Sequence, residues 1–182
     1  MQRVHSFQFV LLFFSLAVAL PSAFAQVAIA TVPAGTNPFA VAVNDTQLLI
    51  DVNGYFAPAG QGGLSLYPAV PCRVLDTRKI GNGQPFSGQL SPPVDVVNSV
   101  CGPSSTAQAY IFNATVVPMG SLGYLALWPD GEGQPVVSTL NATDGAITSN
   151  MAIVPAGNQG KIDAYANGLT QLLLDISSYF AP

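Results

Sequence analysis

Short runs of apolar and β-branched residues, separated by clusters of Gly, Pro, Asn and Asp, recur along most of the chain. No long segment repeats apolar residues at the spacing of a helix, and the turn-forming clusters fall at regular intervals. This pattern is typical of an all-β protein. The clearest predicted strands are residues 107–117, 123–128, 136–140, 150–154, 161–165 and 171–180. We therefore predict an antiparallel, jelly-roll-like sandwich.

The last predicted strand has one apolar face. Because alternate residues of a strand point the same way, Leu172, Leu174, Ile176 and Phe180 are expected to line one side, with mostly polar residues on the other. The strand belongs to the segment TQLLLDISSYFAP, residues 170–182, which repeats TQLLIDVNGYFAP of residues 46–58. The matching face of the earlier copy is Leu48, Ile50, Val52 and Phe56. Both copies are therefore predicted to fit a socket of the same shape.

The repeat divides the chain into four parts. Residues 1–25 combine a basic start, an apolar run and the site Ala23-Phe24-Ala25, as a secretory signal peptide does. Residues 26–58 are predicted to form a three-strand extension that repeats the end of the chain, because TVPAG at 31–35 also resembles IVPAG at 153–157. A linker is expected at 59–63 and a complete β module at 64–182. The protein is thus expected to be secreted, to an extracellular or cell-surface location, with no membrane association once the signal is cleaved.

Composition excludes several functions. Charged residues make up 8% of the chain, against about 25% in ordinary proteins, and such a surface is poorly guarded against association. After the signal peptide, nine acidic and four basic side chains give a net charge of −5, so nucleic acid is not an expected partner. The same part contains no histidine, which excludes a conventional Ser-His-acid triad. No cofactor or metal is predicted, and the protein is not expected to be an enzyme.

Two cysteines, Cys72 and Cys101, are expected to form a disulfide after export, the alternative being two buried thiols. Asp76 and Arg78 are predicted to share a strand face and to form a structural ion pair.

Two further candidate sites have simpler structural explanations. Asp130 and Glu132 offer oxygen ligands or a carboxylate pair, but residues two apart in a Gly-rich turn are more often turn formers. Tyr124 and Trp128 lie four residues apart on one strand face and could stack on a sugar, although a single tryptophan is more often a core residue.

Several longer motifs carry a family resemblance. The strings PCRVLDTR (71–78), AYIFNATVVP (109–118), LGYLALWPDGEGQP (122–135), STLNATDGAITSNMAIVP (138–155) and LLLDISSYFAP resemble a module found, often in tandem, in large secreted bacterial surface proteins. The resemblance covers nearly all of residues 64–182, and 26–58 resembles the tail of a preceding module. It implies a β-rich extracellular domain and no enzymatic activity. This chain departs from the tandem pattern in having one module plus a fraction.

These observations favour a structural role. Three small strands with an apolar face are only marginally stable alone, so the extension is expected to dock on its own module or on another molecule. We predict a protein that assembles head to tail with identical subunits, by strand addition or exchange, into an extracellular filament or surface layer. The rival prediction is a monomeric module that binds a cell-surface glycan.

Overall fold

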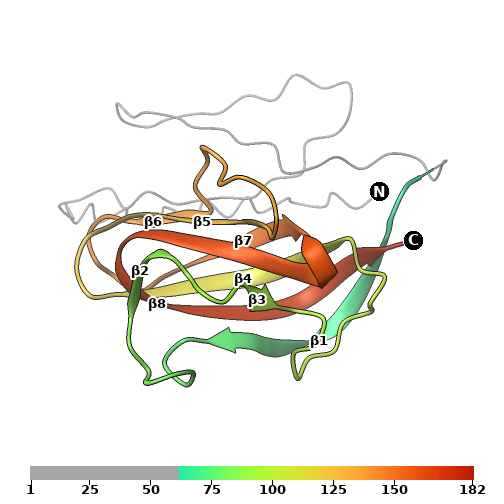
Figure 1. The fold of residues 1–182 in the computed structure, drawn as a ribbon, viewed down its shortest axis with the longest axis horizontal. Coiled ribbons are helices and arrows are strands. Elements are labelled where there is room, and N and C mark those ends of the chain that lie inside the picture. The colour runs from blue at the N-terminus through green and yellow to red at the C-terminus, as the bar shows by residue number, and fades with distance from the viewer. Residues whose placement is uncertain (1–61) are drawn as a thin grey trace, which may run out of the picture.

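The computed structural model describes residues 62–182 (Figure 1). The predicted signal peptide, the extension with its apolar residues Leu48, Ile50, Val52 and Phe56, and most of the linker lie outside the described residues. The prediction of an all-β antiparallel sandwich is confirmed for the part of the chain that is described.

Eight strands and one short 3-10 helix make up residues 62–182. The strands are β1 (Ser65–Asp76), β2 (Phe86–Gln89), β3 (Val94–Asp95), β4 (Ala109–Pro118), β5 (Leu122–Pro129), β6 (Leu140–Ala142), β7 (Thr148–Pro155) and β8 (Lys161–Ala181). The helix η1 (Asn158–Gly160) joins β7 to β8.

The long strand β8 holds the fold together. Its first half pairs with β2, β3 and β5, whereas its second half, from Thr170 onward, lies between β1 and β4. Strand β7 pairs with the other edge of β4, so the order through this half is β1-β8-β4-β7. Figure 1 shows β8 as the red ribbon that runs along the whole module and ends beside the start of β1. The two sheet halves therefore share one strand and cannot separate without breaking it.

The sheet curls over to enclose one core. Strands β5 and β6 approach β7, and the Asn150 Nδ2 donates a 2.7 Å hydrogen bond to the Thr139 carbonyl across this closing seam. Tyr110, Phe112, Leu125 and other side chains with no exposed surface fill the interior. Burying a side chain of this size contributes roughly 1.5–3 kcal/mol, so the core is the main source of stability.

Two details of the predicted strands were wrong. Residues 136–139 are not a strand, and Val136 is fully exposed. The strands predicted at 161–165 and 171–180 are one strand, because β8 runs straight through Asn167-Gly168, whose composition is typical of a turn. A Cβ at Gly168 would lie 2.9 Å from the Ser121 carbonyl oxygen, so this glycine permits close approach of another chain segment and does not form a turn.

The clearest predicted strands did not include β1, β2 or β3. Pro68 and Pro71 interrupt the apolar alternation of β1, which nevertheless runs from Ser65 to Asp76 as an edge strand with an irregular register. Within residues 62–182, no helix is long and apolar enough to cross a membrane.

Candidate assembly interface

The second half of β8 occupies a slot between β1 and β4. Leu172, Leu174 and Ile176 point into the core and are at most 1% exposed. They pair with Val116, Ala114 and Phe112 of β4, which are equally buried. This segment is thus hydrogen-bonded along both edges and covered on its apolar face.

Phe180 does not share that face, contrary to the prediction. The pairing with β4 shifts between Ile176 and Ser178, which inserts one extra residue and reverses the alternation. Tyr179, opposite the fully buried Tyr110, therefore packs against the core, whereas the half-buried Phe180 faces the other side of the sheet. A regular alternation cannot reveal such a bulge.

Polar side chains also hold this strand in its slot. Thr77 donates its hydroxyl to Gln171 Oε1 and accepts a bond from the Leu172 backbone N–H, while Gln171 Nε2 donates to the Gly83 carbonyl. Arg73 binds Asp175 through two hydrogen bonds of 2.7 and 2.8 Å.

At the end of the strand, Tyr179 stacks on Tyr67 with ring centres 5.4 Å apart. The contacts that hold the second half of β8 thus include a bidentate ion pair, a buried side-chain amide and a stacked pair of tyrosine rings.

The copy at residues 46–58 keeps the residues that make these contacts. Gln47, Asp51 and Tyr55 stand where β8 has Gln171, Asp175 and Tyr179. The apolar face differs by Ile50 for Leu174 and Val52 for Ile176. These identical polar positions are a signal that the sequence shows beside the apolar match. The copy therefore repeats the sequence of a central strand, which needs a partner on each edge and a cover over its face.

The slot itself is already occupied by the chain's own β8. Exchanging 170–182 for the copy would return nearly the same contacts and lose one methylene at Val52, a change that costs about 0.5–1.5 kcal/mol. Exchange therefore gains no buried surface. Addition of the copy to an open surface would instead bury apolar area that is now exposed.

An open apolar surface exists on the outer side of the same sheet half. Tyr110 and Val154 face the core, so their strand neighbours Ile111 and Ile153 face outward, as do Leu66 and Met151. Leu66 is 48% exposed and Met151 41%, while Ile111 and Ile153 are half-buried. We call Leu66, Ile111, Met151 and Ile153 the outer patch.

The two edges of this sheet half differ in how they are protected. Strand β1 carries Pro68 and Pro71, which lack an N–H and are characteristic of edges that resist further pairing. Strand β7 pairs only with β4 among the described residues, and its eight residues include no charge and no proline before Pro155. Strands β5 and β6 approach the far edge of β7 at the closing seam, where Asn150 binds the Thr139 carbonyl, so this edge is partly covered by the module itself.

Asp76 lies at a basic corner of the module. It is the last residue of β1, and Arg78 follows in the turn, so the two do not share a strand face as predicted. The turn nevertheless brings them together, since Arg78 Nε and Nη2 donate bonds of 2.8 and 2.9 Å to the Asp76 carboxylate. These bonds lower the pKa of Asp76 to about 2, and Arg73 and Lys79 lie within 4.0 Å.

Cys72 and Cys101 form a disulfide, as predicted, with their Cα atoms 5.7 Å apart. The bond joins β1 to the loop that follows β3, and both residues pack against the core. It fixes this loop beside the edge strand.

The two aromatic candidates have different environments. Trp128 is 4% exposed and donates its ring N–H to the Glu132 carbonyl, so it is a core residue and offers no face to a sugar. Tyr124 is half-buried and stacks on Tyr165 with ring centres 5.6 Å apart. Of the pair, only Tyr124 retains some exposed surface.

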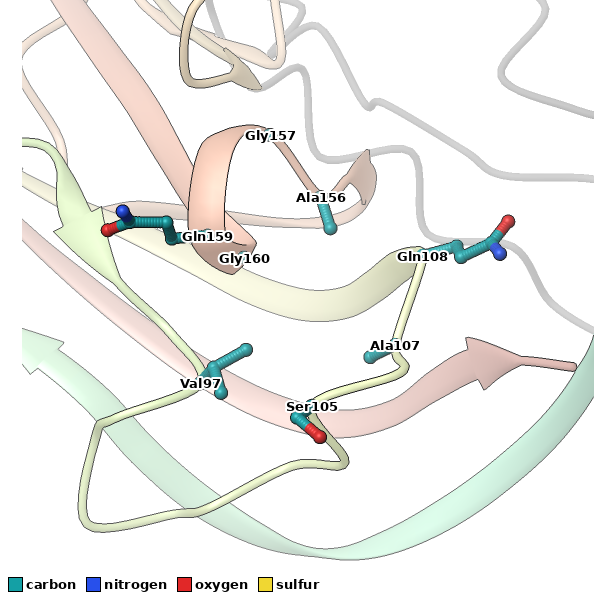
Figure 2. Close-up of a pocket in the computed structure, with 8 residues that line it drawn as sticks. All are labelled: Val97, Ser105, Ala107, Gln108, Ala156, Gly157, Gln159 and Gly160. Atoms are coloured by element: carbon teal, nitrogen blue, oxygen red, sulfur yellow. The ribbon is translucent and has the colours of Figure 1, made fainter.

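A cleft of about 600 Å³ lies between the disulfide-bonded loop and the turn that carries η1 (Figure 2). Figure 2 shows Val97, Ser105 and Ala107 on one side and Ala156, Gly157 and Gly160 on the other. None of its eight lining residues is ionisable, so it offers no acid, base or charged anchor. Within residues 62–182, no group of three or more His, Cys, Asp or Glu could hold a metal ion.

Comparisons with family models, curated proteins and solved structures find no match for this chain. The resemblance to a tandem surface module accordingly stays a prediction.

Proposed function

We propose that this protein is a secreted structural subunit that assembles head to tail into an extracellular filament or surface layer. The observation that carries the proposal is the repeat at 46–58. The matching segment of β8 is buried on its apolar face and hydrogen-bonded to a neighbouring strand along each edge. A second copy of such a strand needs its own cover. The module supplies a candidate in its outer patch.

The contact between subunits is heterologous, because the extension of one molecule docks on the module of the next. Each molecule then has one donor and one acceptor, and a rotation that does not close gives an open filament. The low charge of the chain supports this role, since few like charges oppose association.

A competition experiment tests the proposal. The mature chain, residues 26–182, is brought to a concentration series and its mass followed by light scattering, with and without a synthetic peptide of sequence TQLLIDVNGYFAP. We expect mass to grow with concentration and the peptide to suppress that growth, whereas a peptide with the same residues in scrambled order has no effect. A constant monomer mass across the series would contradict the proposal.

The glycan-binding alternative has one observation in its favour, the Tyr124–Tyr165 stack, because a half-buried aromatic can receive a sugar ring. It predicts a monomer that a polysaccharide column retains and a Tyr124→Ala variant that elutes freely. Trp128 contributes nothing to this alternative, since its ring is buried.

A further inference from the structure

Two stacked tyrosines lie on the outer face of the sheet half that contains β5, the first part of β8 and β2. Leu125 of β5 and Ala166 of β8 belong to the core cluster. Because successive residues of a strand point to opposite faces, their neighbours Tyr124 and Tyr165 stand on the outside. The two rings stack with centres 5.6 Å apart and planes inclined by 24°, and both side chains are half-buried. We call this pair the aromatic platform.

Two glutamine side chains flank the aromatic platform. The exposed Gln89 of β2 lies opposite Tyr165, and its Nε2 donates a 3.1 Å hydrogen bond to Asp163. Gln134, exposed in the loop after β5, donates its Nε2 to the Tyr124 hydroxyl at 3.3 Å. Each bond uses one N–H of the amide, so a second N–H and the Oε1 acceptor are left for a ligand.

Asp163 fixes the position of the Gln89 amide. Its side chain belongs to a residue that is 4% exposed, and none of the ion pairs within residues 62–182 includes it. A nearly buried carboxylate requires hydrogen-bond donors, and the Gln89 amide supplies one. The amide is therefore held in place before a ligand arrives, which reduces the entropy lost on binding.

We infer that the aromatic platform, with Gln89 and Gln134, binds a β-linked saccharide whose pyranose rings carry equatorial hydroxyl groups. Such a ring presents axial C–H groups that pack on an aromatic face, and its hydroxyls both donate and accept hydrogen bonds. A proline-rich peptide also packs on aromatic side chains, but proline has no N–H to offer to the two Oε1 acceptors. The mixed donors and acceptors around the rings therefore favour a saccharide.

This site is separate from the surface proposed for assembly. The outer patch belongs to β1, β4 and β7, whereas the aromatic platform belongs to β5 and the first part of β8. An assembled subunit can therefore hold a saccharide, and binding requires no second subunit. The inference is thus independent of the proposed function.

The second tyrosine stack of the module provides an internal control. Tyr67 and Tyr179 stack with ring centres 5.4 Å apart, but the Tyr67 hydroxyl is bonded to the carbonyl of Pro182 and not to a glutamine amide. The two stacks therefore differ in the polar groups beside them and hardly in ring geometry.

A titration followed by nuclear magnetic resonance tests the inference. The mature chain, labelled with ¹³C in its tyrosine rings and kept below the concentration at which it associates, is titrated with cellotetraose, chitotetraose and xylotetraose. We expect at least one of them to shift the Tyr124 and Tyr165 signals with saturation, while the Tyr67 and Tyr179 signals stay. No saturable shift with any of the three, or equal shifts in both stacks, would overturn the inference. A shift of Tyr124 and Tyr165 with decaproline but with no saccharide would overturn it as well.

Matched glutamine variants test the polar contacts. Gln89→Ala removes a flanking amide, whereas Gln84→Ala removes an exposed amide that is bonded to the Asn82 carbonyl between β1 and β2. We expect Gln89→Ala to raise the Kd of the saccharide at least about 5-fold and Gln84→Ala to leave it unchanged. Gln134→Ala, in an exposed loop, repeats the test without the bond to Asp163 and should act as Gln89→Ala does. An unchanged Kd in both Gln89→Ala and Gln134→Ala would refute the site, and assembly of a chain that binds no saccharide would leave the proposed function standing.

Discussion

Truncating matched side chains in the two copies of the repeated strand should affect different properties. The change in the second copy should lower stability, and the change in the first copy should weaken assembly. Leu174 has no exposed surface and lies opposite Ala114 in the core, so Leu174→Ala removes apolar contacts and leaves a cavity. Such changes cost about 2–5 kcal/mol, a large part of the roughly 5–15 kcal/mol that stabilises an ordinary domain. Ile50 is the counterpart of Leu174, but the slot that it would fill is taken. Ile50→Ala should therefore change the free energy of unfolding by less than about 0.5 kcal/mol in dilute solution.

The assay is urea unfolding of the mature chain at low concentration, followed by light scattering at high concentration. We expect Leu174→Ala to lower the unfolding midpoint and Ile50→Ala to leave it unchanged while weakening association. An equal loss of unfolding free energy in both variants would refute the reasoning, since it would mean that the copy is already buried within its own molecule.

Three other predictions concern the module. Replacing both Cys72 and Cys101 by alanine should lower the free energy of unfolding by about 3–4 kcal/mol, because the closed loop of 29 residues no longer restricts the unfolded chain; a free energy of unfolding within about 0.5 kcal/mol of wild type would contradict this. Asp76→Asn should cost roughly 1–2 kcal/mol at pH 7, after allowance for its solvent-exposed basic partners. Because the pKa of Asp76 is lowered from 3.8 to about 2, this difference is complete above about pH 5 and should vanish as pH falls towards 2, which acid titration of both proteins measures. Gly157→Ala should destabilise the turn after β7 by more than about 2 kcal/mol in thermal melts, since a Cβ there would overlap the Asp130 backbone; an unchanged melting temperature would contradict this.

The alternation of apolar residues predicted the fold class because it reports how each strand buries one face. It identified β4, β5 and β7 with boundaries shifted by two residues or fewer. The prediction failed where contacts with distant parts of the chain decided the structure. Asn167-Gly168 has the sequence of a turn, yet the glycine allows Ser121 to approach a continuous strand. Pro68 and Pro71 concealed β1, whose pairing with β8 depends on residues about 100 positions away.

The candidate interface was predictable only in part. The repeated apolar positions were visible in the sequence, and the identity of Gln47 and Asp51 with Gln171 and Asp175 could have been noticed beside them. Their importance depends on the partners Thr77 and Arg73, which only the folded chain brings near. The outer patch depends on strand order, and a single sequence does not specify strand order.

The most direct test of the central claim is negative-stain electron microscopy of residues 26–182 beside a chain that begins at Gly60. The long form should give filaments or sheets that grow with concentration, and the short form should give dispersed particles, because it lacks the repeated strand. Single particles from both forms would contradict the claim that the extension joins one molecule to the next.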